Sequence, residues 1–306
     1  MNGKKTLKNT SALSRRTMSE VIVFRIALAG FIIWGVLLAY PIIWVLLNSI
    51  KSAEQYYDNI FYAKPFEFPS EFYFQNYIDA FSKVKLKKGL IESNFWIMLF
   101  NTLWYCTLKV GLGLVIPMAA AYALAKCQFP GRMLIYNTMI LSSMIPIFGT
   151  QGAAYTFYYN LGLVNNPLFV IYTSFGVLGV GLMVSYGYFK TMDKGYAEAV
   201  YIDGGNDFVV FFKVMLPMAL PLNITFAVLG FIAAWNDSGT FLIYLSEYPT
   251  LASGVFELSN GNDTLRFTNP PQYFALLIIM AAPVMIAFSL AADTIMENFS
   301  MGGIKG

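Results

Sequence analysis

The segment EAVYIDGGNDFVVFFKVMLP, residues 198–217, is a polar and charged island between long apolar stretches. Residues 193–202 are typical of a short helix that presents Glu198 to water. Gly204 and Gly205 follow. Because glycine readily adopts positive φ, we expect this pair to end the helix and turn the chain sharply.

A second short helix is predicted directly after the glycine pair. Asn206 or Asp207 offers a side-chain N-cap for it. The helix itself, residues 208–216, is apolar enough to lie against neighbouring helices, and we expect Pro217 to open the next long helix. Two short helices joined by a tight turn form a knob that a groove on a soluble partner can hold. Motion of that partner would then move the long helices on either side.

The composition around this segment is that of a membrane protein. The 306 residues are 57% hydrophobic and only 12% charged, whereas about a quarter of a soluble domain is charged. A bilayer core needs about 20 helical residues. We therefore predict an all-α, polytopic membrane protein with six membrane-spanning helices, which lie in the apolar runs 26–50, 93–125 (interrupted by Lys109), 133–189 (two helices broken at 160–167), 214–236 and 267–292.

Basic residues are concentrated on the side of the membrane that holds the N-terminus. If the spans alternate in direction, this side carries Lys4, Lys5, Lys8, Arg15, Arg16, Arg25, Lys126, Arg132, Lys190, Lys194, Lys213 and Lys305. The positive-inside rule then predicts that both termini are cytoplasmic. The opposing observation is a lysine cluster on the outer side, at residues 83, 85, 87 and 88.

Several kinds of chemistry are excluded by what the chain lacks. It contains no histidine, so catalysis and metal binding by histidine are ruled out. Cys106 and Cys127 lie in or beside spans and indicate neither a disulfide framework nor a metal site. The chain has no Gly-x-x-x-x-Gly-Lys-Ser/Thr motif, so we expect no ATP hydrolysis and no catalytic residue. A net charge of +3 indicates no nucleic-acid partner.

The segment 198–217 resembles the EAA coupling segment of ABC-importer permeases. The shared pattern is Glu-Ala, then five residues and a Gly, and nine residues after that Gly an aliphatic-x-Leu-Pro sequence. The chain departs from that pattern at Val200, where alanine is usual, and at Val214, where isoleucine is usual. The resemblance implies that the following residues couple the permease to its ATPase: Glu198, Ala199, Asp203, Gly204, Gly205, Leu216 and Pro217.

Four further motifs extend the resemblance over nearly the whole chain. They are Ala121-Tyr122-Ala123-Leu124-Ala125 with Phe129-Pro130-Gly131-Arg132, Leu161-Gly162-Leu163-Val164-Asn165-Asn166, Trp235-Asn236-Asp237 and Gly302-Gly303-Ile304-Lys305-Gly306. Together they are similar to the six-span subunit of the maltose-transporter class of type I ABC importers. This class implies a second homologous permease, two ABC ATPase subunits and an extracytoplasmic solute-binding protein. ATP and Mg are then used by the ATPase, this chain binds no cofactor, and Lys305 and Gly306 reach the ATPase interface.

The resemblance also divides the chain. Residues 1–23 form a cytoplasmic basic tail and residues 24–306 the transmembrane permease domain. Within that domain, 51–92 is an extracytoplasmic loop, 190–216 the cytoplasmic coupling segment and 297–306 a cytoplasmic tail. The loop is rich in aromatic residues, which suit either a packed cap with an aromatic belt at the lipid interface or a docking surface for the binding protein.

Polar groups inside spans are costly and mark candidate transport paths. Lys109 lies mid-span and Asp237 near an outer end. The two residues either line a water-filled path or form an ion pair with each other, although their predicted depths in the membrane match poorly for a pair. Alternatively, Lys109 snorkels toward the interface. Trp235 and Asn236 are candidate sugar contacts, by ring stacking and by amide hydrogen bonds, although a tryptophan is equally common at the lipid interface. Tyr186 is a further candidate, and helix packing alone would also explain it.

These observations predict the membrane-spanning subunit of an ABC importer that takes up a carbohydrate, an oligosaccharide in particular, by alternating access across the bacterial cell membrane. Uptake of another small solute, such as glycerol phosphate or a polyol, is the alternative within this class. A self-sufficient secondary transporter would need ionisable coupling residues at the midplane, where only Lys109 fits. An intramembrane enzyme would need clustered catalytic groups in the spans, and none is evident.

Overall fold

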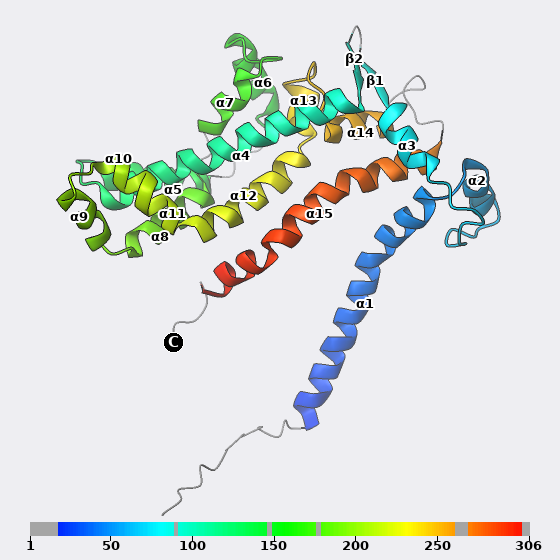
Figure 1. Cartoon of the computed structure of the whole chain (residues 1–306), viewed down its shortest axis with the longest axis horizontal. Coiled ribbons are helices and arrows are strands. Elements are labelled where there is room, and N and C mark those ends of the chain that lie inside the picture. Colours follow the sequence, from blue (N-terminus) through cyan, green and yellow to red (C-terminus); the bar gives the residue numbers. More distant parts are fainter. Residues whose placement is uncertain (1–17, 89–90, 146–148, 176–178, 261–268, 302–306) are drawn as a thin grey trace, which may run out of the picture.

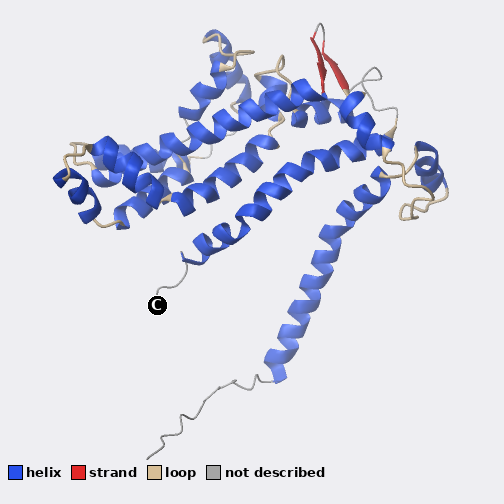
Figure 2. Cartoon of the chain, in the orientation of Figure 1, coloured by secondary structure: helices blue, strands red, loops and turns tan. Residues whose placement is uncertain are grey.

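The computed structural model describes residues 18–88, 91–145, 149–175, 179–260 and 269–301. Regular structure in these residues is helical apart from one antiparallel hairpin, β1 (Lys85–Lys88) and β2 (Ile91–Asn94) (Figures 1 and 2). The all-α prediction is therefore confirmed apart from this hairpin.

Three single helices are long and apolar enough to cross a membrane: α1 (Met18–Ser49), α4 (Phe95–Lys126) and α15 (Pro270–Met301). They correspond to the first, second and sixth predicted spans. α1 begins inside the predicted basic tail, and α15 continues past the predicted end of the sixth span at residue 297, as far as Met301.

The third and fourth predicted spans differ from single continuous helices. The expected break at 160–167 is present, but each half is interrupted again. The run consists of α5 (Arg132–Met144), α6 (Gln151–Asn160), α7 (Leu168–Phe175) and α8 (Val180–Thr191). Glycine accompanies these additional interruptions: Gly149 has a φ of +74°, and Gly179 precedes α8 in a non-helical conformation.

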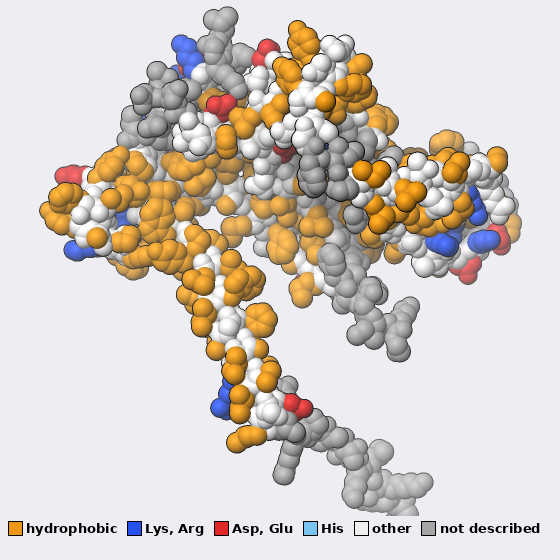
Figure 3. Space-filling model, turned by 180° about the vertical axis from the view of Figure 1, so that it is seen from behind, with side chains coloured by type: hydrophobic (Ala, Val, Ile, Leu, Met, Phe, Trp, Pro, Cys, Tyr) orange, Lys and Arg blue, Asp and Glu red, His pale blue; other side chains and the backbone are white. Residues whose placement is uncertain are grey.

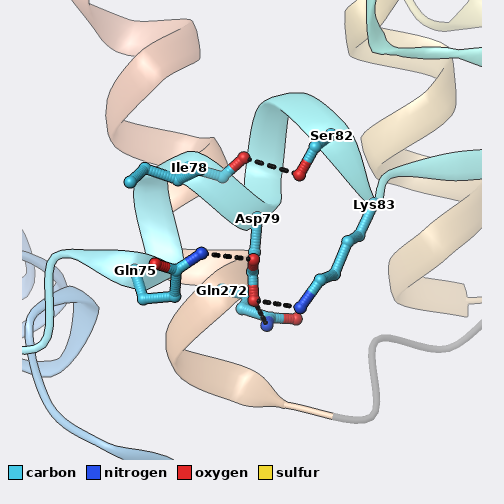
Figure 4. A network of polar contacts seen from close by, with 6 residues as sticks. All are labelled: Gln75, Ile78, Asp79, Ser82, Lys83 and Gln272. Atoms are coloured by element: carbon cyan, nitrogen blue, oxygen red, sulfur yellow. Dashed lines mark hydrogen bonds and ion pairs between the residues drawn. The ribbon is translucent and has the colours of Figure 1, made fainter.

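The predicted extracytoplasmic loop is a folded cap. It contains α2 (Ala53–Phe61), α3 (Gln75–Ser82) and the β1–β2 hairpin. The buried carboxylate of Asp79 joins α3 to the first turn of α15 (Figure 4). One oxygen accepts from Gln75 at 3.0 Å, and the other accepts from Lys83 at 2.8 Å and from Gln272 at 2.7 Å.

α12 (Leu220–Trp235) lies between α4 and α15, and α8 packs on α4 (Figure 1). α1 contacts α15 and then diverges from the body, so most of its apolar surface is exposed (Figures 1 and 3). α2, α3 and the hairpin lie toward one end of the molecule. α9 (Gly195–Ile202) and α10 (Asp207–Val209) lie at the opposite end.

The buried side chains form two separate clusters. The hairpin-side cluster joins the first half of α4 to β1, α7, α13 (Gly239–Ile243), α14 (Leu251–Asn260) and α15. It includes Leu86, Met98, Tyr105, Phe169, Phe241 and Leu276. The α9-side cluster joins the second half of α4 to α8 and to the segment after α10. It includes Met118, Tyr122, Leu182, Phe189, Phe211 and Met215.

Candidate functional site

The knob predicted from residues 193–217 begins with α9. Its first turn contains Glu198, whose carboxylate is exposed and lies where the helix dipole favours negative charge. Ala199 is also exposed. Asp193 accepts a hydrogen bond from the amide of Gly195 at 2.8 Å, which fixes the entry to the helix.

The glycine pair ends α9 in a Schellman motif. The amide of Gly204 donates to the carbonyl of Tyr201 at 3.0 Å, and the amide of Gly205 donates to the carbonyl of Val200 at 2.8 Å. Gly204 has a φ of +79°, and Asp203 is the C-cap residue. The turn predicted from the two glycines is therefore present.

The second part of the knob starts at Asn206, and the choice left open between Asn206 and Asp207 is settled. The side-chain oxygen of Asn206 accepts from the amide of Val209 at 3.1 Å. Asp207 instead accepts a short hydrogen bond from the hydroxyl of Tyr201, across the turn. This bond to the carboxylate raises the pKa of Tyr201. α9 is thereby tied to α10 on both sides of the glycine pair.

The predicted helix 208–216 is irregular. A π-helix runs over Val210–Met215, followed by one turn, α11 (Leu216–Met218), and a bend of 75° before α12. The expectation that Pro217 opens the next span is wrong, because α12 begins at Leu220. Pro221 explains the bend: it has no amide hydrogen, and inside a continuous helix its ring would clash with the carbonyl of Pro217.

Two side chains satisfy carbonyls at the bend. Asn223 donates to the carbonyl of Leu216 at 3.1 Å, and the hydroxyl of Tyr188 donates to the carbonyl of Met218 at 2.9 Å. Because Tyr188 belongs to α8, this bond joins the helix before the knob to the helix after it. The knob and both flanking helices are therefore mechanically connected.

The knob has a buried root and an exposed apolar tip. Phe211 and Met215 are buried in the α9-side cluster, where the ring of Phe211 lies 5.1 Å from that of Tyr122 on α4. Ile202 is 86% exposed and Phe208 is 74% exposed. Figure 3 shows apolar side chains together with basic and acidic ones at this end of the molecule. Exposed apolar groups rimmed by charges are typical of a protein-binding surface.

A cavity of about 380 Å³ lies between the two buried clusters. It is bounded by α4, the start of α8, and α12, and most of its wall is apolar. Lys109 and Asp237 both line it, together with Tyr105 and Ser185. Tyr105 was not recognised from the sequence, although its position four residues before Lys109 places both on one face of α4.

The direct ion pair between Lys109 and Asp237 that was considered from the sequence is not among the ion pairs of the described residues. Lys109 donates to the hydroxyl of Thr173 on α7 at 3.3 Å. Asp237 accepts from the hydroxyl of Tyr105 at 2.6 Å, and from the hydroxyl and the amide of Thr240 at 2.7 and 3.0 Å.

The other path candidates within the described residues do not line this cavity. The indole of Trp235 is buried and donates to the carbonyl of Met280 on α15 at 3.0 Å. Asn236 is exposed and its amide bonds back to the carbonyl of Ile232. Tyr186 is buried and stacks on Tyr136, with ring centroids 4.2 Å apart. Lys305 and Gly306 lie outside the described residues.

Comparison with known proteins identifies the family. A model of the inner membrane component of binding-protein-dependent transport systems matches residues 111–301, which include the knob and most of the cavity wall but not Tyr105 and Lys109. The chain belongs to this family. The permease is therefore a multi-pass membrane protein of a transport system, as the coupling segment predicted.

Two relatives match it over most of its length. NgcG, a permease of a diacetylchitobiose uptake system from Streptomyces coelicolor, is 27% identical over 90% of this permease and 87% of its own length. SmoH, a permease of a sulfoquinovosyl glycerol transport system from Agrobacterium fabrum, is 28% identical over 87% and 89%. A chain of a bacterial ABC transporter involved in import of the acidic polysaccharide alginate shares the fold, with a TM-score of 0.74, 22% identity, and coverage of 91% and 98%.

Proposed function

We propose that this permease is the membrane-spanning subunit of an ATP-binding-cassette importer for a carbohydrate. The relatives support the substrate class, because their transport systems are described as carrying diacetylchitobiose and sulfoquinovosyl glycerol. Transport follows alternating access, in which the cavity faces one side of the membrane and then the other. This chain has no ATP-binding motif, so ATP and Mg are used by two partner ATPases.

The observation that carries the proposal is the architecture of the knob. Its exposed tip, Ile202 and Phe208, is the docking surface for the ATPase. Its root, Phe211 and Met215, is fixed in the α9-side cluster. The Tyr188 bond and the bend before α12 then transmit a displacement of the tip to α8 and α12.

The same geometry supports the remaining partners and the orientation. The last turns of α15 lie toward the end that carries α9, and α2 and α3 lie at the opposite end (Figure 1). We place the α9 end and both termini in the cytoplasm, and the folded cap outside, where it meets the solute-binding protein. The exposed flank of α1 faces lipid and the second, homologous permease subunit.

The docking surface is tested by two substitutions at the knob, Ile202→Asp and Glu198→Lys. Full burial of an isoleucine side chain contributes about 1.5–3 kcal/mol, and 1.4 kcal/mol is about tenfold in affinity. We therefore expect each variant to lose at least tenfold in ATPase co-purification from solubilised membranes, and to lose carbohydrate uptake in parallel.

The matched control is Phe61→Asp, an equally drastic change at a residue that is 81% exposed on the folded cap. It should leave ATPase co-purification unchanged. Normal assembly and uptake in both knob variants would refute docking at this surface. A self-sufficient secondary transporter would also continue uptake after removal of the ATPase genes.

A further inference from the structure

Lys109 lies at a depth from which its ammonium group does not reach water outside the membrane. α4 has 32 residues, which at 1.5 Å per residue is about 48 Å, and Lys109 lies close to its middle. The side chain does not extend along the helix toward either end. It reaches across to Thr173 on α7, beside the cavity of about 380 Å³. Snorkelling therefore does not explain this residue.

The two charged groups of the cavity differ in how well the protein satisfies them. The Asp237 carboxylate accepts three hydrogen bonds, one from Tyr105 and two from Thr240. These donors hold the carboxylate in place, and its negative charge still interacts electrostatically with Lys109. The carboxylate joins the end of α12 to α4, and we assign it a structural role in the cavity wall.

Lys109 has three N–H donors. Among the described residues, its hydrogen bond goes to the hydroxyl oxygen of Thr173, at the long distance of 3.3 Å. The single hydrogen of that hydroxyl is shared between the carbonyls of Phe169 and Val170, so its oxygen acts toward Lys109 as a neutral acceptor only. The remaining N–H donors of Lys109 are available to a ligand that enters the cavity. A lysine at this depth is costly, and its usual explanation is recognition of a ligand or an ion.

We propose that Lys109 selects an anionic substituent on the transported saccharide, such as the carboxylate of a uronic acid or a sulfonate. This inference rests on the proposed carbohydrate uptake and narrows its substrate class. The cavity volume of about 380 Å³ suits a small ligand group. The apolar wall, with the rings of Tyr105 and Phe226, offers surfaces for the C–H face of a sugar ring. Lys109 then forms a charge-assisted hydrogen bond to the anion.

The glycines of the wall provide an independent way to close the site. Gly113 lines the cavity, and a Cβ added there would meet nothing within 4 Å, so the first carbon of Gly113→Leu fits without a clash. The variant leaves Lys109 in place and removes the space beside it.

The test uses the complete transporter in cells, with three radiolabelled disaccharides of the same linkage that end in glucose, in glucuronate or in a 6-sulfonated sugar. Uptake is expressed per assembled complex for wild type, Lys109→Gln, Lys109→Arg and Gly113→Leu. We expect wild type to favour an anionic disaccharide and Lys109→Gln to raise its KM by about 10-fold to 100-fold. Lys109→Arg should retain most of the preference, and Gly113→Leu should reduce uptake of the preferred sugar.

Three results would overturn the inference: uptake of only the neutral disaccharide, a KM for the anionic sugar that Lys109→Gln leaves unchanged, or full uptake in Gly113→Leu. None of these three results contradicts the proposal of carbohydrate import itself. Uptake of none of the three sugars, by a transporter that still assembles with its ATPase, would count against the proposed function as well.

Discussion

Replacing Gly205 by alanine should open the turn of the knob. A Cβ at this position would lie 2.4 Å from Cγ1 of Val200 and 3.0 Å from the Val200 carbonyl oxygen. Valine is stiff at χ1, and the same carbonyl accepts the 2.8 Å hydrogen bond that closes the Schellman motif. Neither atom can retreat without separating α9 from the glycine pair.

The expected cost is that of overpacking a tight contact, about 1–3 kcal/mol. If docking of the ATPase requires the closed turn, a strain of about 2 kcal/mol weakens docking by about 30-fold. The assay is co-purification of the ATPase with the permease over a range of ATPase concentrations, together with uptake. The root of the knob is anchored in the α9-side cluster, so the thermal stability of the whole chain should change far less than the docking.

Gly187→Ala is the matched control. Gly187 lies inside α8, and an added Cβ there would meet nothing within 4 Å. Alanine also has the higher helix propensity, so this variant should dock the ATPase as wild type does. Equal docking by Gly205→Ala and Gly187→Ala would refute the argument that the close contact at Val200 shapes the docking surface.

Four further outcomes follow from the contacts described above. Asn206→Ala removes the N-cap of α10 and should cost about 1 kcal/mol, measurable as weaker ATPase docking. Phe211→Ala empties the root of the knob and should lower the stability of the solubilised permease by about 3–5 kcal/mol, whereas a stability within 1 kcal/mol of wild type would show that the root is not packed. Tyr105→Phe leaves Asp237 without its donor from α4 and should cost about 1–3 kcal/mol in thermal unfolding. The hydrogen bonds from Lys83, Gln75 and Gln272 lower the pKa of Asp79 below its ordinary value. The ionised Asp79 therefore stabilises the folded chain fully above about pH 4, and this stabilisation is lost as pH falls through the lowered pKa. Asp79→Asn should flatten the dependence of melting temperature on pH in this acid range.

The knob was predictable because its signals are local. Two adjacent glycines, an Asn-Asp pair and the exposed Glu198 specify a helix, a turn and a cap within a few residues, and the structure has each of them. The π-helix and the bend before α12 were not predictable in the same way. Pro217 and Pro221 both occupy the first turn of a helix, α11 and α12 respectively, and the pattern of apolar residues does not choose between them as the start of the span.

The cavity illustrates the limit of reading single residues. Lys109 and Asp237 were identified as polar groups in apolar runs, but their partners, Thr173 and Tyr105, are distant in the sequence and carry no signal of their own. Trp235 was predicted to contact sugar because a tryptophan ring can stack on a sugar. Its burial against α15 depends on how α12 and α15 pack, which hydropathy does not specify. A packed cap was predicted for residues 51–92, but its elements were not, because hydropathy separates spans from loops and does not detect short amphipathic helices such as α2 and α3.

The two buried clusters bear on the order in which the chain assembles during its synthesis. The buried residues of the α9-side cluster all lie between Met118 and Ala219, whereas those of the hairpin-side cluster extend from Ala80 to Leu276. The first cluster is complete once α11 has been made, and the second must wait for α15, the last helix. Because contacts close in sequence form sooner than distant ones, we expect the α9 end to be assembled on the nascent chain while the cap end is still open.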